Sequence, residues 1–177
     1  SSEEDVKREL ERVRREDERI HRDLERVLEE SERRVETWDR DAKRTLEKVE
    51  EDLRRDGLEK ELVDKLKEAL DRIREDIERS HRELRKLHEE IRDELRKLNE
   101  ETDRRLRDIE DKLRKTGEEE LLEELKRRLK EILDRYRREA ERLKRENEEM
   151  NKRHRERLEE LKKRLKELLE RMKEARK

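Results

Sequence analysis

The sequence predicts an all-α protein, an up-down-up antiparallel three-helix bundle of long, nearly straight helices. Charged residues make up 64% of the chain and apolar residues 26%, with no proline and one tryptophan and one tyrosine. The β-branched, aromatic and turn residues that a sheet needs are therefore scarce. Apolar residues recur every three or four positions, which is the period of a helix with one buried face. Two glycines divide the 177 residues into three nearly equal segments.

The first helix is expected over 2–56. Ser2 and Asp5 have the spacing of a capping box, in which two side chains satisfy backbone N–H groups at a helix start. Gly57 follows a basic turn, and glycine at that position adopts the left-handed conformation that ends a helix. The apolar stripe of this helix has a period of about 3.6 residues, which predicts a nearly straight helix. It contains Val6, Leu10, Val13, Ile20, Leu24, Val27, Val35, Trp38, Ala42, Val49 and Leu53.

The second helix is expected over 58–116 and the third over 118–177, with Gly117 between them. Three glutamates follow Gly117, as the amino end of a helix dipole prefers. Each helix is roughly 85 Å long, and minimal loops force the three to alternate in direction within one domain, 1–177. The handedness of the bundle stays open. The second stripe contains Leu62, Leu66, Ala69, Ile73, Ile77, Leu84, Leu87, Ile91, Leu95, Leu98, Leu106, Ile109 and Leu113.

Composition also excludes several classes of function. The chain has no cysteine, which excludes disulfides and thiol chemistry. A net charge of -2 argues against a nucleic-acid binder, which is basic overall or on one face. No apolar run approaches the ~20 residues of a membrane span, and no signal-like segment opens the chain. We therefore expect a soluble protein with no nucleic-acid or membrane partner, and the compartment stays open.

Polar residues inside the stripes are the candidate functional residues. In two antiparallel helices, residues that are equally far in sequence from the connecting loop lie at the same height, or level, along the bundle axis. Matching the polar residues by level predicts two polar clusters. One cluster, at mid-bundle, contains Ser31, Ser80, His81, His88, Asn147, Asn151 and His154. The other, nearer the second loop, contains Asp17, Asn99, Thr102 and Tyr136, with His21 beside them. A buried polar group destabilises unless it is paired, so such layers are expected to hydrogen-bond and to fix the register.

The histidines have two expected environments. In one, His154 and either His81 or His88 are neutral and accept hydrogen bonds within the network. In the other, a carboxylate is their partner, and Asp39 and Glu78 lie near enough in level to supply it. The hydroxyl of Thr45, which lies apart from both clusters, is expected to bond to its own helix backbone.

Metal binding is suggested by two Glu-x-x-His pairs, Glu18 with His21 and Glu78 with His81. This spacing places both side chains on one helix face and occurs twice in dinuclear carboxylate bundles. The two pairs differ in level by about a dozen residues, or roughly 18 Å along the axis. A shared metal is therefore excluded, and we expect neither a metal nor a cofactor.

Hydrolysis would use Ser31 or Ser80 as nucleophile and His154 as base. A closely packed three-helix axis offers no pocket and no free backbone N–H for an oxyanion, so we expect no enzyme. The two aromatic residues, Trp38 and Tyr136, are expected in the core with their polar ends hydrogen-bonded, rather than as base-stacking platforms.

Near-equal helices, glycine loops, the absence of proline and phenylalanine, and a surface of Glu, Arg and Lys resemble de novo designed, parametrically generated three-helix bundles. The resemblance covers the whole chain. The polar stripe residues resemble the subset of such designs with buried hydrogen-bond networks. The resemblance implies a designed structural scaffold with no natural biochemical function. In such a scaffold, buried hydrogen-bond networks specify the register and packing of the helices. We expect the chain to be thermostable and monomeric.

Two alternatives stay open. The chain could be one component of a designed helical assembly that binds a partner helix, which requires a second apolar stripe. The extra apolar residues are too few for one, so we expect a monomer; they are Val63, Leu70, Leu122, Leu133 and Leu169. A natural coiled-coil or spectrin-like structural protein is the other alternative, although spectrin-type repeats are shorter and less uniform.

Overall fold

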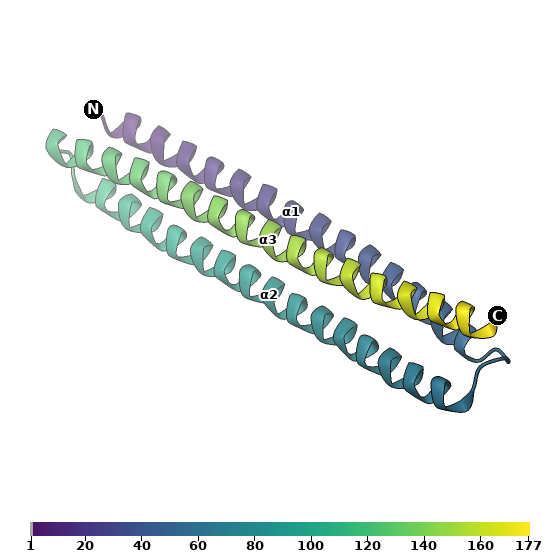
Figure 1. Ribbon diagram of the computed structural model, residues 1–177. Helices are drawn as coiled ribbons and strands as arrows, with labels where there is room; N and C mark the ends of the chain where they lie inside the picture. Colours follow the sequence, from purple (N-terminus) through teal and green to yellow (C-terminus); the bar gives the residue numbers. More distant parts are fainter. Residues whose placement is uncertain (1) are drawn as a thin grey trace. The chain divides into compact units, whose positions relative to one another are not determined.

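The computed structural model describes residues 2–177, of which no residue is in a strand, and the chain is 94% helical. Three helices, α1 (Glu3–Leu53), α2 (Lys60–Lys115) and α3 (Glu119–Arg176), pack against each other as a three-helix bundle (Figure 1). The predicted fold class is confirmed. No helix among residues 2–177 is long and apolar enough to cross a membrane.

The helix ends follow the expected local chemistry. Asp5 N–H donates to Ser2 Oγ at 3.2 Å and Ser2 N–H donates to an Asp5 carboxylate oxygen at 3.3 Å, so the predicted capping box is present. Gly57 has a φ of 106°, which only glycine adopts without strain. The helix α1 ends at Leu53, three residues before the expected bound of 56, because the turn before Gly57 is not helical.

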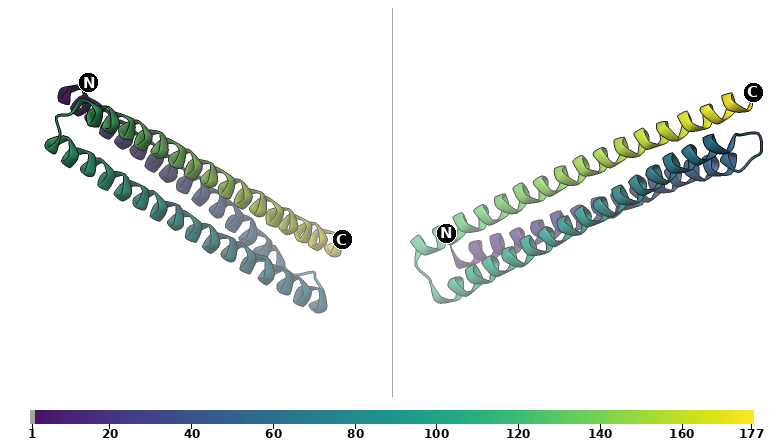
Figure 2. Two further views of the ribbon diagram at one scale, coloured as in Figure 1. Left: turned by 90° about the vertical axis from the view of Figure 1, so that its left-hand side faces the viewer. Right: turned by 60° about the horizontal axis from the view of Figure 1, so that its bottom comes forward.

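The chain divides into two compact units. Residues 2–29 and 88–147 belong to the first unit, and 30–87 and 148–177 to the second. In each unit, three helical segments run side by side, and the segment of α2 runs antiparallel to those of α1 and α3 (Figures 1 and 2). Each unit has its own apolar core. The first is built around residues such as Val13, Ile109 and Leu129, and the second around residues such as Val49, Leu66 and Leu165.

Two positions differ from the predicted stripes. Asp39 is 5% exposed, whereas its neighbour Trp38 is only partly buried. His88 is 7% exposed, whereas Leu87 is 39% exposed. Successive residues on a helix are about 100° apart, so the two members of each pair point in different directions. In both pairs the polar residue is the more buried one, and Trp38 packs against the core of the second unit from its edge rather than from within it.

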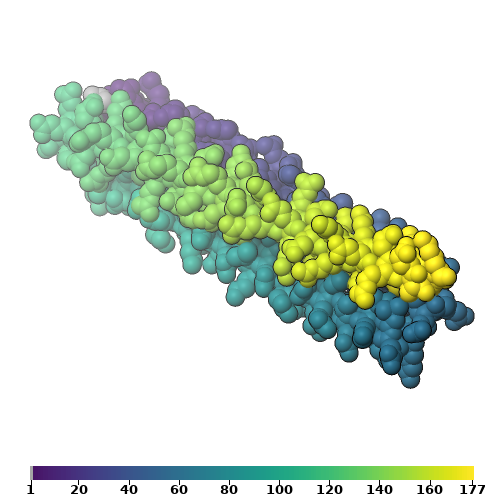
Figure 3. All heavy atoms as spheres, in the orientation of Figure 1, coloured from purple at the N-terminus to yellow at the C-terminus, as the bar shows by residue number. Residues whose placement is uncertain are grey.

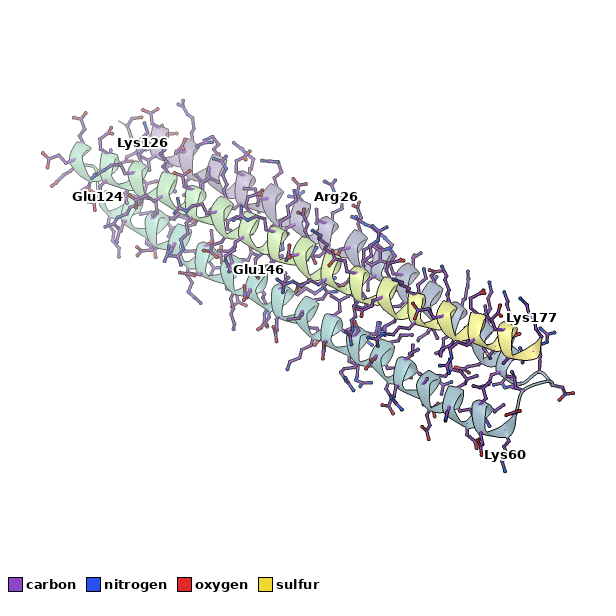
Figure 4. All side chains as sticks on the ribbon, in the orientation of Figure 1. Arg26, Lys60, Glu124, Lys126, Glu146 and Lys177 are labelled. Carbon is purple, nitrogen blue, oxygen red and sulfur yellow. The ribbon has the colours of Figure 1, made fainter. Side chains whose placement is uncertain are left out.

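Charged side chains cover the outside of the helices. Figure 3 shows the side chains of α3 projecting over the face turned to the viewer. The labelled side chains in Figure 4, including Arg26, Glu124 and Glu146, point away from the ribbons. Many of these charges pair at i,i+3 or i,i+4, as Arg22 does with Glu18 at 3.2 Å. Such exposed pairs contribute little to stability individually.

Candidate functional site

A buried carboxylate on α1 joins the three helical segments of the second unit. Asp39 Oδ1 is 2.8 Å from His154 Nε2 on α3, and Asp39 Oδ2 is hydrogen-bonded to His81 Nδ1 on α2. An ionised carboxylate only accepts hydrogen bonds, so each of these ring nitrogens carries a proton and donates it. The carboxylate alternative for the histidines, with Asp39 as the partner, is therefore the one in the structure.

The second ring nitrogen of His154, Nδ1, is hydrogen-bonded to a serine. Ser80 Oγ lies 2.9 Å from His154 Nδ1. Because Nε2 carries the proton that faces Asp39, Nδ1 of the neutral ring accepts, and the Ser80 hydroxyl donates. Ser80, His154, Asp39 and His81 thus form one connected set of hydrogen bonds, which we call the Asp39 cluster.

The electrostatics of the Asp39 cluster favour an ionised carboxylate. Burial disfavours the charge on Asp39, yet the hydrogen bonds from His154 and His81, together with the positive charge that these rings carry when protonated, outweigh it and bring the pKa of Asp39 below its usual 3.8. The side chain of His154 is 3% exposed and that of His81 is 35% exposed. The cluster therefore has a buried end at His154 and an end at His81 that reaches solvent.

A groove opens beside the Asp39 cluster, where the sequence predicted no pocket. Its volume is about 450 Å³, and both Ser80 and His154 line it. Leu84, Leu87 and Met150 supply apolar walls, and the rest of the lining is charged, with three arginines and the acids Asp76 and Glu83. All of its lining residues belong to α2 or α3, and Ser80 has the smallest side chain among them.

The other residues of the predicted mid-bundle cluster are distributed over both units. Asn151 Nδ2 donates to Ser31 Oγ, which makes a further polar contact between α3 and α1 in the second unit. His88 and Asn147 are buried but belong to the first unit. Asn147 Oδ1 has no hydrogen-bond partner among residues 2–177. The structure therefore brings Ser80, His81 and His154 together and joins Ser31 to Asn151.

The second predicted cluster lies in the first unit and contains one hydrogen bond between its members. Tyr136 is fully buried, and its hydroxyl donates to Asn99 Oδ1 at 3.3 Å, although Asn99 itself is exposed. Burial and the negative charges of Asp17 and Glu25 raise the pKa of Tyr136. Thr102 is buried, at 7% exposure.

Asp17 has the opposite environment to a paired carboxylate. It is 5% exposed, and neither of its carboxylate oxygens has a hydrogen-bond partner among the described residues. Burial raises the pKa of Asp17 to about 7, against a smaller lowering by Arg137 and together with a further raising by Glu16. His21, one turn further along α1, lies 2.9 Å from Glu25 through Nε2, while its Nδ1 has no partner in the described part of the chain.

The histidines of the two Glu-x-x-His pairs contact other acidic residues in the structure. His21 contacts Glu25 and His81 contacts Asp39, so each histidine of a Glu-x-x-His pair is held by an acid outside that pair. Over residues 2–177 there is no group of three or more His, Cys, Asp or Glu side chains that could hold a metal ion.

Asp39 is the residue that the predicted clusters omitted. Its position, four residues after Val35 and three before Ala42, continues the buried stripe of α1 and was a signal in the sequence. Trp38 took its place in the prediction, but its ring lies under Arg155, with the guanidinium carbon 5.6 Å from the ring centre. Thr45 Oγ1 donates to the backbone carbonyl of Asp41 at 3.1 Å, as predicted.

The Asp39 cluster offers two kinds of chemistry. It ties three helical segments through directional hydrogen bonds, and it places a serine hydroxyl on a ring nitrogen beside a groove. No protein-family model matches the chain, and no curated protein or solved structure matches it.

Proposed function

We propose that this chain is a structural scaffold of the designed type, without a natural biochemical function, whose buried polar groups specify the register of its helices. The observation that carries the proposal is the Asp39 cluster, in which one carboxylate accepts hydrogen bonds from histidines of both other helices. The contact between Ser31 and Asn151 adds a second polar link between α1 and α3.

The physical reason is the difference between apolar and polar layers. A slip of one helix by seven residues moves it about 10 Å along its axis and exchanges one leucine layer for another. The same slip separates Asp39 from His154 and His81 and leaves a buried carboxylate without a partner. Leaving a buried charge without its partners in this way costs about 3–5 kcal/mol, so the cluster penalises the wrong register far more than the apolar layers do.

The surface of the chain supports a monomer. Among residues 2–177, the exposed large apolar side chains are Leu87 and Leu121, which do not form a stripe for a partner helix. Long helices of strong helix formers with short loops favour high stability, and we expect thermal unfolding above ~70 °C. In light scattering we expect a mass of 22.4 kDa that does not change with concentration. A mass that rises with concentration overturns the monomer.

Spin-label distances test the role of the cluster. The chain lacks cysteine, so Lys43→Cys on α1 and Lys163→Cys on α3, both exposed in the second unit, give two unique label sites. In the parent we expect one narrow distance distribution. In a variant with Asp39→Leu, Ser80→Ala and His154→Leu, we expect retained helicity and a distribution that is broad or has maxima separated by about 10 Å.

A matched control removes polar side chains outside the cluster. Glu36 and Arg40 form an exposed pair at 3.7 Å on α1, and replacing both by alanine should leave the narrow distribution unchanged. If the variant without the Asp39 cluster keeps the same narrow distribution as this control, the cluster does not specify the register and the proposal is wrong.

A further inference from the structure

Three residues of the Asp39 cluster are connected in the order that activates a nucleophile. Ser80 Oγ lies 2.9 Å from His154 Nδ1, and His154 Nε2 lies 2.8 Å from Asp39 Oδ1. A hydroxyl is activated when a base within hydrogen-bond reach takes its proton and a third group orients that base and stabilises its charge. All three conditions are met here, with the two ring nitrogens of His154 exchanging the roles they have in the usual serine triad.

We propose that Ser80 is a modification site, a nucleophile that takes an acyl group from activated aryl esters entering the adjacent groove. Ser80 is partly exposed and lines this groove, whose volume is about 450 Å³. Its base, His154, is nearly buried, so solvent does not replace the hydroxyl as the partner of Nδ1. The inference is independent of the scaffold role, because it concerns a reaction of one side chain.

The reaction balances without any further reagent. Ser80 Oγ attacks the ester carbonyl carbon as its proton passes to His154 Nδ1, and the carbonyl π electrons move to oxygen. Collapse of this adduct re-forms the carbonyl and breaks the bond to the aryl oxygen. The aryl oxide leaves, and the proton on His154 passes to it or to water. The products are an ester on Ser80 and a phenol.

The groove defines the class of ester. Leu84, Leu87 and Met150 present apolar surface suited to an aryl ring and a short acyl chain. The charged lining is mixed, because Asp76 and Glu83 accompany the arginines and Arg157 lies 3.8 Å from Asp76. Neutral aryl esters with short acyl chains are therefore the class of ester that fits the groove.

The reaction is expected to stop at one acyl group per chain. In the middle of a helix every backbone N–H is used by the helix, so no backbone oxyanion site assists the second step. An aryl ester carries a good leaving group and reacts without that assistance, whereas the alkyl ester on Ser80 does not. The chain is thus labelled rather than turned into an efficient hydrolase.

The chain contains its own control serines. Ser31 is 3% exposed and is bonded to Asn151, and Ser2 is exposed at the start of α1 with its hydroxyl on the backbone of Asp5. Neither hydroxyl is paired with an imidazole in these contacts. Differences in acylation between Ser80 and these two residues therefore separate activation by His154 from exposure alone.

The test uses 4-nitrophenyl butyrate with the full chain near pH 8, followed by peptide mapping. Surface lysines also react, but hydroxylamine removes an ester from serine and leaves an amide on lysine. We expect a hydroxylamine-labile butyryl group on Ser80, formed at least about tenfold faster than on Ser2 or Ser31. Labelling of Ser80 no faster than that of exposed Ser2 overturns the proposal, and this comparison needs no variant.

Variants assign the roles. Ser80→Ala should abolish the labile label at this site, and His154→Gln should slow the labelling of Ser80 at least about tenfold. Asp39 acts through His154 as a positioning residue, so Asp39→Asn should slow labelling and shift the pH–rate profile. Ser31→Ala should leave the rate unchanged. Circular dichroism of each variant checks folding, and equal rates in the parent and a folded His154→Gln variant contradict activation by His154.

Discussion

Asp17 and Asp39 both lie on the buried face of α1 with 5% exposure, and their surroundings are opposite. Asp39 accepts hydrogen bonds from two histidines, and its pKa is lowered. Asp17 has no hydrogen-bond partner for either carboxylate oxygen among the described residues, and burial raises its pKa to about 7. One buried carboxylate thus favours the folded state when ionised, and the other when protonated.

Asp17 makes the stability of the chain fall as the pH rises. Its pKa is 3.8 when unperturbed and about 7 in the folded chain, so between these values the folded state holds a proton that the unfolded state has lost. The contribution of Asp17 is therefore most favourable below about pH 4 and is lost as the pH rises through 7, by at most about 4 kcal/mol. Asp17→Asn should match the parent near pH 3.5, where Asp17 is protonated in both states, and should be more stable than the parent at pH 8 in denaturant unfolding.

The control for this prediction is an exposed aspartate of the same unit. Asp103 is exposed and pairs with Arg107 at 2.9 Å, so Asp103→Asn should change stability by less than about 1 kcal/mol at either pH. Parallel stability–pH curves for the parent and Asp17→Asn would show that Asp17 is paired, by water or otherwise, and would contradict the prediction.

Asp39 should show the opposite pH dependence. Because its folded pKa lies below 3.8, its contribution is complete above about pH 4 and is lost as the pH falls through the folded value. Asp39→Asn at pH 7 leaves the histidine donors without their carboxylate and should cost about 3 kcal/mol, with a smaller cost at pH 3. Asp41→Asn, which removes an exposed carboxylate that contacts Lys162, should cost less than about 1 kcal/mol. A cost that does not change between pH 7 and pH 3 contradicts the prediction.

The fold follows from local signals in the sequence, and those signals carry no information about contacts between helices. Gly57, the capping box at Ser2 and the spacing of the leucines each act within one helix or turn, and together they predict three helices with the first turn at Gly57. The positions of Trp38 and Asp39 do not follow from such signals. Hydrophobicity places tryptophan inside, and only the histidines of the other two helices make aspartate the better buried residue.

The sequence predicted only part of the candidate site, because local signals do not show which side chains of different helices meet. Level matching along antiparallel helices identified Ser80, His81 and His154, and named Asp39 as a carboxylate near them. Level alone does not give the direction in which a side chain points, so it does not show which residues of one level contact each other. The groove beside Ser80 depends on the sizes of side chains on two helices and has no signature in either one.

Substitutions of Leu84 and Leu87 test which face of α2 is buried. Leu84 is 3% exposed and Leu87 is 39% exposed, although both were in the predicted stripe. Leu84→Ala should cost about 2–5 kcal/mol, the usual range for a buried leucine, whereas Leu87→Ala should cost no more than about 0.5 kcal/mol. Urea unfolding of the two variants under one condition measures the difference. Equal losses would place Leu87 in the core.

The two glycines should respond differently to the same substitution. Gly57 has a φ of 106°, where a side chain is strained, and the nearest atom to an added Cβ would be Arg176 Cγ at 3.5 Å, an ordinary contact. Gly57→Ala should therefore cost about 1–3 kcal/mol through backbone strain alone.

Gly117 does not have such a φ, and an added Cβ would meet only the flexible carboxylate of Glu3 at 3.6 Å. Gly117→Ala should be neutral or stabilise by about 0.4–1 kcal/mol, because alanine restricts the unfolded chain. Midpoints of denaturant unfolding measure both effects, and a loss at Gly117 as large as that at Gly57 would show that crowding, rather than φ, sets the requirement for glycine.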